Sequence, residues 1–139
     1  MRIFRMLPLA LVCLVGCGGP PLAGKWNMSA AGSPPGSKLV TEFMADTFKV
    51  DVEFEQGGMK MKFDFSGDYT YDGKKLKMVG KTVHIDESSL PAAVKGQLPM
   101  IKSSLEKTVL TTQEGDAKLE GDTLTFTEKG KVTTFTKIK

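Results

Sequence analysis

Alternation of apolar and polar residues dominates the middle of the chain. Every second residue is apolar between residues 48 and 54, and the alternation resumes between residues 59 and 65, after a Gly-Gly pair at 57–58. Because side chains alternate between the two faces of a β-strand, this pattern predicts two amphipathic strands joined by a tight turn. A two-residue turn there places Phe54 opposite Met61 on the apolar face. On the polar face it places glutamates of the first strand opposite lysines of the second.

Two further hairpins follow from turn-forming pairs. Asp72-Gly73, a pair favoured in type I′ turns, predicts that Tyr69 lies opposite Leu76. Lys129-Gly130 joins the two arms of a hairpin within residues 122–137. Each predicted pairing joins segments that are consecutive in the chain, which indicates an antiparallel sheet.

Additional short strands complete the expected sheet, near residues 24–30, 38–45, 81–85 and 117–120. The total of about eight to ten strands predicts a mainly β fold, an antiparallel up-and-down meander or barrel. Closure into a barrel is favoured because it leaves no exposed strand edges. We interpret the Gly/Ser/Pro cluster at residues 32–37 as a loop at the rim, so residues 24–139 form a single domain.

One segment, at about residues 90–110, follows a helical period instead. Its apolar residues recur at spacings of four and three, and they are Leu90, Val94, Leu98, Ile101, Leu105 and Val109. Gly96 and Pro99 divide the segment, which predicts two short helices at 92–96 and 99–110. We interpret it as a helical plug over one barrel end, since its lysines form no concentrated basic band typical of a helix on a membrane.

The N-terminal segment has the composition of a secretory signal. Arg2 and Arg5 precede an apolar stretch at residues 7–15 that is too short to span a bilayer. The sequence Leu-Val-Gly-Cys that follows, ending at Cys17, resembles the lipobox of bacterial lipoproteins. The resemblance implies that residues 1–16 are a cleaved signal peptide and that Cys17 is lipidated.

Residues 17–23 then form the lipidated cysteine and a short tether. Two or more acyl chains hold a protein in a membrane effectively permanently, so the membrane is an expected partner through the N-terminal lipid. Gly18, rather than an aspartate, follows Cys17, and this resembles sorting to the outer membrane in well-studied Gram-negative bacteria. The resemblance implies a cell-envelope location, on the periplasmic face of the outer membrane if the bacterium is Gram-negative.

Loss of the signal peptide changes the charge and the cysteine content. The chain has 19 Lys and Arg residues against 16 acidic ones, and without Arg2 and Arg5 the net charge falls to +1. This balance offers no basic excess for nucleic-acid binding. Cys13 leaves with the signal and Cys17 carries the lipid, so no cysteine remains for a disulfide, a zinc site or a thiol nucleophile.

The motif Gly-Lys-Trp at residues 24–26 resembles the Gly-x-Trp motif in the first strand of lipocalin-type barrels. Residues 67–76 and 121–126 resemble the strand repeats of small bacterial lipocalin-like lipoproteins. Lipocalins stack a late-strand arginine on that tryptophan, and here Lys137 or Lys139 would take its place. The resemblance implies a barrel domain of lipocalin type.

Two classes of function are consistent with the same apolar barrel interior. In a binding module, inward-facing side chains hold a small apolar or lipid-like ligand. The candidate ligand-binding residues are Phe48, Val50, Phe54, Met61, Phe63, Tyr69 and Tyr71. In a structural or interaction lipoprotein, these side chains fill a solid core and function lies on rims such as residues 33–37.

A third class is a Cu(I)-binding envelope protein. Met59 and Met61 share one strand face, and together with His84 they offer thioether and imidazole ligands that suit Cu(I). Catalysis is not expected, because the chain has one histidine and its acid/base candidates, such as Asp51 and Asp64, lie on a charged strand face. The sequence therefore favours a non-enzymatic protein that needs no cofactor.

Overall fold

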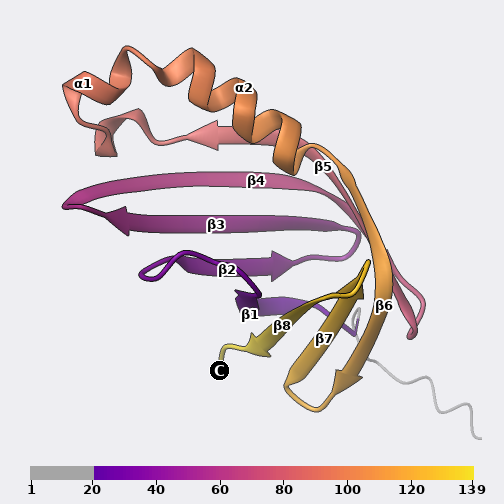
Figure 1. The fold of residues 1–139 in the computed structure, drawn as a ribbon. Coiled ribbons are helices and arrows are strands. Elements are labelled where there is room, and N and C mark those ends of the chain that lie inside the picture. The colour runs from indigo at the N-terminus through magenta and orange to yellow at the C-terminus, as the bar shows by residue number, and fades with distance from the viewer. Residues whose placement is uncertain (1–20) are drawn as a thin grey trace, which may run out of the picture.

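Eight antiparallel strands form a closed barrel in which each strand pairs with the next along the chain and β8 pairs with β1 (Figure 1). This is a computed structural model that describes residues 21–139, so Cys17 and the rest of the lipobox lie outside the described residues. The strands are β1 (Gly24–Ala30), β2 (Lys38–Phe43), β3 (Thr47–Gln56), β4 (Met59–Tyr71), β5 (Lys75–Ile85), β6 (Thr112–Glu120), β7 (Thr123–Glu128) and β8 (Lys131–Lys137). The predicted fold class is confirmed.

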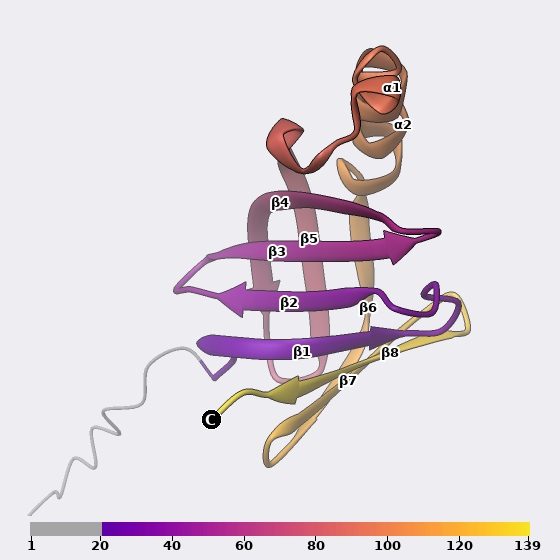
Figure 2. The same cartoon turned by 90° about the vertical axis from the view of Figure 1, so that its left-hand side faces the viewer.

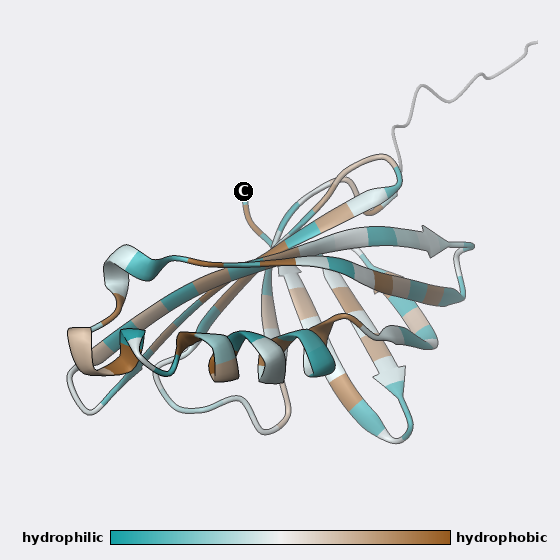
Figure 3. Ribbon diagram, turned by 90° about the horizontal axis from the view of Figure 1, so that it is seen from above, coloured by the Kyte–Doolittle hydropathy of each residue, from teal (hydrophilic) through white to brown (hydrophobic). Residues whose placement is uncertain are grey.

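Apolar and polar residues alternate along the strands (Figure 3), and burial alternates with them along β3 and β5, so successive side chains point to the inside and the outside of the barrel. The β3–β4 hairpin has the predicted register, with Phe54 opposite Met61 and Asp51 opposite Asp64. The β7–β8 hairpin also turns at residues 129–130 as predicted. The resulting inward faces supply the apolar core.

The β4–β5 turn differs from its predicted form. Tyr71, rather than Tyr69, lies opposite Leu76, which makes the loop two residues longer. The reason is the Asp72 carboxylate, whose Oδ1 accepts hydrogen bonds of 2.8 and 2.7 Å from the backbone N–H groups of residues 74–75. A shift of two residues keeps every side chain on its predicted face, because the strand period is two.

This turn predicts a pH-dependent contribution to stability. Hydrogen bonds from the backbone N–H groups of Lys75 and Lys74 lower the pKa of Asp72. Because the folded-state pKa is below the unfolded value, the contribution is present above the unfolded pKa and is lost as the pH falls through the folded pKa. We expect Asp72→Ala to be less stable than the wild type near neutral pH, and the two to converge in acid. Urea unfolding at several pH values measures this, and a difference that stays constant into acid would contradict it.

Three short helices connect β5 to β6: η1 (Glu87–Ser89), α1 (Ala92–Lys95) and α2 (Leu98–Val109). The two predicted α-helices are present within two residues at each end, and a proline stands in the first turn of α2 as expected. Asp86 caps η1 by accepting a 3.0 Å hydrogen bond from the Ser88 N–H. Within residues 21–139, no helix is both long and apolar enough to cross a membrane.

Helix α2 occupies the place that β6 leaves free beside β5. Strand β6 pairs only with residues 75–79 of β5, and β5 then continues to Ile85 beside β4. A register shift between Ser66 and Gly67 marks the point where the β4–β5 ladder changes. Beyond it, α2 packs against β5 (Figure 1). The helix thus covers the part of the sheet that extends past the closed barrel.

The two ends of the barrel therefore differ. We call the end that the buried Trp26 closes the plugged end, and the end that carries the helices the helical end. The plugged end carries the start of β1, the C-terminus and the turns at residues 44–46, 72–74 and 121–122. The helical end carries the 57–58 turn and the three helices (Figure 2). At the plugged end the start of β1 is tied to the C-terminal residues, since the Ile138 N–H donates a 2.8 Å hydrogen bond to the Lys25 carbonyl.

Candidate functional site

Trp26 closes the plugged end. Its side chain is buried, and its Nε1–H donates a 2.8 Å hydrogen bond to the carbonyl of Leu22, which is itself fully buried. The Lys137 Nζ lies 5.4 Å from the centroid of the Trp26 ring, so a lysine provides the cation that the lipocalin resemblance implied. Leu22 was assigned to the tether, but it belongs to the core. The signal for it is an apolar residue four positions before the tryptophan.

Three of the candidate ligand-binding residues lie in the packed core near this plug. Phe48 and Val50 are 1% exposed and Tyr69 is 6% exposed. Tyr69 packs edge-on against Phe43, with ring centroids 4.9 Å apart, and its hydroxyl donates a 2.6 Å hydrogen bond to the Met44 carbonyl. Burial raises the pKa of Tyr69. This packing leaves these three side chains almost no surface for a ligand, and the half-buried Tyr71 packs against the same core.

The other three candidates face inward at the helical end. Phe54, Met61 and Phe63 are half-buried. Met61 and Phe63, with Phe65, pack against a second apolar cluster formed by β5, Leu90 and the helices. The apolar residues of α2 in this cluster are Leu98, Ile101, Leu105 and Val109. Since no residue of α2 is fully buried, apolar side chains from both the helix and the strands keep part of their surface accessible.

Sequence reasoning identified the apolar stripe of α2 but did not include it among the ligand-binding candidates. The three- and four-residue spacing was the available signal, and it gives the face of the helix. It does not say which strand residues that face meets. The structure supplies this information by placing the stripe against inward-facing residues of β4 and β5.

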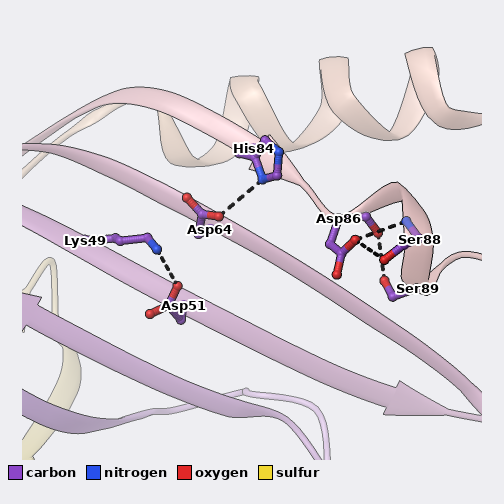
Figure 4. Close-up of polar contacts among 7 residues, drawn as sticks. All are labelled: Lys49, Asp51, Asp64, His84, Asp86, Ser88 and Ser89. Atoms are coloured by element: carbon purple, nitrogen blue, oxygen red, sulfur yellow. Dashed lines mark hydrogen bonds and ion pairs between the residues drawn. The ribbon is translucent and has the colours of Figure 1, made fainter.

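The outer face of β3, β4 and β5 carries a row of charged side chains (Figure 4). Asp51 lies opposite Asp64, and Asp64 lies opposite His84. The Lys49 Nζ is 3.1 Å from Asp51 Oδ1, and the His84 Nδ1 is 3.4 Å from Asp64 Oδ1. The hydrogen bond with Asp51 raises the pKa of Lys49. The facing carboxylates of Asp51 and Asp64 thus each have a nitrogen partner, the Lys49 Nζ for Asp51 and the His84 Nδ1 for Asp64.

A shallow groove of about 490 Å³ runs over this outer face. Its charged side chains largely pair with one another. Glu53, for example, lies 3.2 Å from the Lys62 Nζ and 3.7 Å from the Lys60 Nζ, and the contact with Lys62 lowers the pKa of Glu53. Pairing of this kind is typical of a solvated sheet face, and exposed ion pairs contribute little to stability.

The structure does not bring the proposed Cu(I) ligands together. Met59 and Met61 have the same strand parity as the inward-facing Phe63. His84 lies opposite Asp64 on the outer face, so its imidazole points away from the two thioethers. Over residues 21–139, no group of three or more His, Cys, Asp and Glu side chains is arranged to hold a metal ion.

Together, the fold and the two ends define a closed eight-stranded antiparallel meander barrel with short helices between its fifth and sixth strands. An uncharacterized protein from Bacteroides eggerthii has a similar fold, with a TM-score of 0.52 and 14% sequence identity. The similarity covers 84% of this chain and 99% of that chain, and at this identity it concerns the fold alone. No protein-family model and no curated protein matches the sequence.

Proposed function

We propose that this protein is a non-enzymatic, lipocalin-like lipoprotein of the cell envelope that binds a small apolar or lipid-like ligand at the helical end of its barrel. The lipobox ending at Cys17 supports the membrane anchor. The observation that carries ligand binding is the difference in burial between the two barrel ends. Phe48, Val50 and Tyr69 are buried towards the plugged end, whereas Phe54, Met61 and Phe63 are only half-buried at the helical end.

The ligand would lie between α2 and the inward-facing residues of β3 and β4. Phe54, Met61 and Phe63 approach from the strands, and Ile101 and Leu105 approach from the helix. Covering apolar surface gains about 25 cal/mol per Å², so a ligand that completes this packing binds without a charged partner. Methionine suits such a site because its unbranched side chain adapts to different ligand shapes.

The charged residues support a binding protein rather than an enzyme. His84 is exposed and its imidazole contacts Asp64 on the outer face, so it points away from the apolar cluster on the other face of β5. A general acid or base would need to stand beside a site that holds a substrate. We therefore propose no catalytic residue and no cofactor.

A structural or interaction lipoprotein with a filled core is the second candidate. The burial of Phe48, Val50 and Tyr69 favours it, because these residues pack as an ordinary core. The two candidates differ in their predictions for the helical end. In a purely structural protein, the half-buried residues there bind no small molecule.

A matched pair of methionine substitutions tests the ligand site. Met61 faces inward at the helical end, whereas Met44 is 43% exposed at the plugged end. We expect Met61→Gln to weaken binding of an apolar fluorophore about tenfold, or about 1.4 kcal/mol, and Met44→Gln to leave it unchanged. Fluorescence titration measures both affinities. Equal affinities in the two variants, or no binding by the wild type, would favour the structural candidate.

A further inference from the structure

We propose that the plugged end of the barrel lies against the anionic headgroups of the anchoring membrane, so that the helical end and its ligand site face away from it. The inference rests on the lipidation of Cys17 proposed above. Two observations carry it: the short chain between Cys17 and the barrel, and a group of lysines at the plugged end.

The chain length restricts where the barrel can lie. Leu22 is fixed in the core, and it stands five positions after Cys17 in the sequence. Five extended residues span at most about 18 Å. Strand β4, with 13 residues, is roughly 43 Å long, so the helical end is beyond the reach of this linker. An acylated Cys17 therefore holds the plugged end near the bilayer.

Three exposed lysines at the plugged end can face an anionic lipid surface. Lys25, Lys74 and Lys75 are exposed there, and within the described part of the chain they form no ion pair. Two acidic residues lie directly opposite these lysines, Glu42 opposite Lys25 and Asp116 opposite Lys75. Of the other acidic residues at this end, Asp72 accepts backbone hydrogen bonds and Asp122 lies 3.2 Å from the Lys139 Nζ. Each lysine near an anionic surface adds to membrane attraction within about 10 Å.

Exposed apolar side chains accompany these lysines. Met44 is 43% exposed and Ile138 is 39% exposed, both at the plugged end. The helical end also exposes apolar side chains, namely Met59, Met100 and Val132. In the opposite orientation, these side chains would face the bilayer. The linker length and the lysines favour the plugged end. As a consequence, the ligand exchanges with the aqueous space or a partner in it rather than with the anchoring bilayer.

Energy transfer from two labelled positions measures the orientation. Ala45 is exposed at the plugged end and Gln56 is exposed at the helical end. The acylated protein, as Ala45→Cys or Gln56→Cys, is purified from bacterial membranes, labelled and reconstituted into vesicles of phosphatidylethanolamine, phosphatidylglycerol and a headgroup acceptor dye. Because the sulfur of Cys17 carries the lipid, each variant takes one label. We expect several-fold higher transfer from position 45 than from position 56.

Charge-matched variants test the role of the lysines in the same assay. Replacing Lys25, Lys74 and Lys75 with glutamine should lower transfer from position 45 on anionic vesicles to the level found on phosphatidylcholine vesicles. The control replaces three lysines at the helical end, with an identical change in net charge and no expected effect; they are Lys60, Lys95 and Lys129.

Three results of the transfer assay would overturn the proposal: equal transfer from the two labels, higher transfer from position 56, or no effect of the plugged-end substitutions. Protein that does not float with the vesicles also overturns it, because the anchor is then missing. These outcomes are distinct from a failure of ligand binding, which the fluorophore titration measures in solution without any membrane.

Discussion

Gly67→Ala is expected to lower the free energy of unfolding by about 3 kcal/mol or more, the upper end of the cost of overpacking. A Cβ atom at residue 67 would lie 1.8 Å from the carbonyl oxygen of Val79 on the neighbouring strand. Gly67 pairs with Gly80 beside the register shift in the β4–β5 ladder. Because the obstacle is backbone rather than a flexible side chain, the two strands must separate to accept the methyl group.

Gly96→Ala is the matched control. Gly96 has a φ of −65° at the end of α1, and a Cβ atom there would meet nothing within 4 Å. Its replacement restricts the unfolded chain without strain in the folded one, so stability should stay the same or rise by about 0.4–1 kcal/mol. Urea unfolding compares the two variants. If Gly67→Ala is as stable as Gly96→Ala, the close approach of β4 and β5 is wrong.

Trp26→Ala is expected to cost about 3–5 kcal/mol, the usual loss for a large aromatic residue in a core. The substitution removes a buried indole, its hydrogen bond to the Leu22 carbonyl and the ring beneath Lys137. The Leu22 carbonyl then loses its hydrogen-bond donor in the plug.

Val132→Ala is the control for this prediction, because Val132 is 46% exposed and its truncation should change stability by less than about 0.5 kcal/mol. Denaturant unfolding gives both values. A Trp26→Ala protein with wild-type stability would mean that the plugged end is held closed by other contacts.

The β3–β4 hairpin could be predicted to the residue, because both arms alternate in polarity and a Gly-Gly pair separates them. The β4–β5 turn could not. A carboxylate at Asp72 that binds two backbone N–H groups stabilises a longer loop, and this geometry is invisible in the polarity pattern. The face of every residue was still correct, since the error was an even number of residues.

The ligand-binding candidates illustrate a second limit. Phe48 and Phe54 share one face of β3, yet Phe48 is buried in the core and Phe54 is half-buried at the other end of the barrel. Polarity alternation gives the face of a residue but not its height along the barrel axis. That height depends on where the barrel closes and where α2 packs, and both are set by residues distant in the sequence.

The face of His84, in contrast, was available from the sequence. Val83 and Ile85 flank it, and both are apolar and buried. Alternation places the residue between them on the polar face, opposite to Met59 and Met61. The Cu(I) hypothesis combined suitable ligand types without considering which strand face each of them occupies. The register of β4 with β5 places His84 on the outer face, away from the two methionines.

Native mass spectrometry tests the central claim, that the helical end holds an apolar ligand, most directly. The acylated protein is released from bacterial membranes and weighed under native and denaturing conditions. We predict a native mass that exceeds the denatured mass by one lipid-sized molecule, and loss of this excess in Met61→Gln but not in Met44→Gln. Identical native and denatured masses for the wild type, with no uptake of an added fatty acid, would contradict the claim and favour a filled structural barrel.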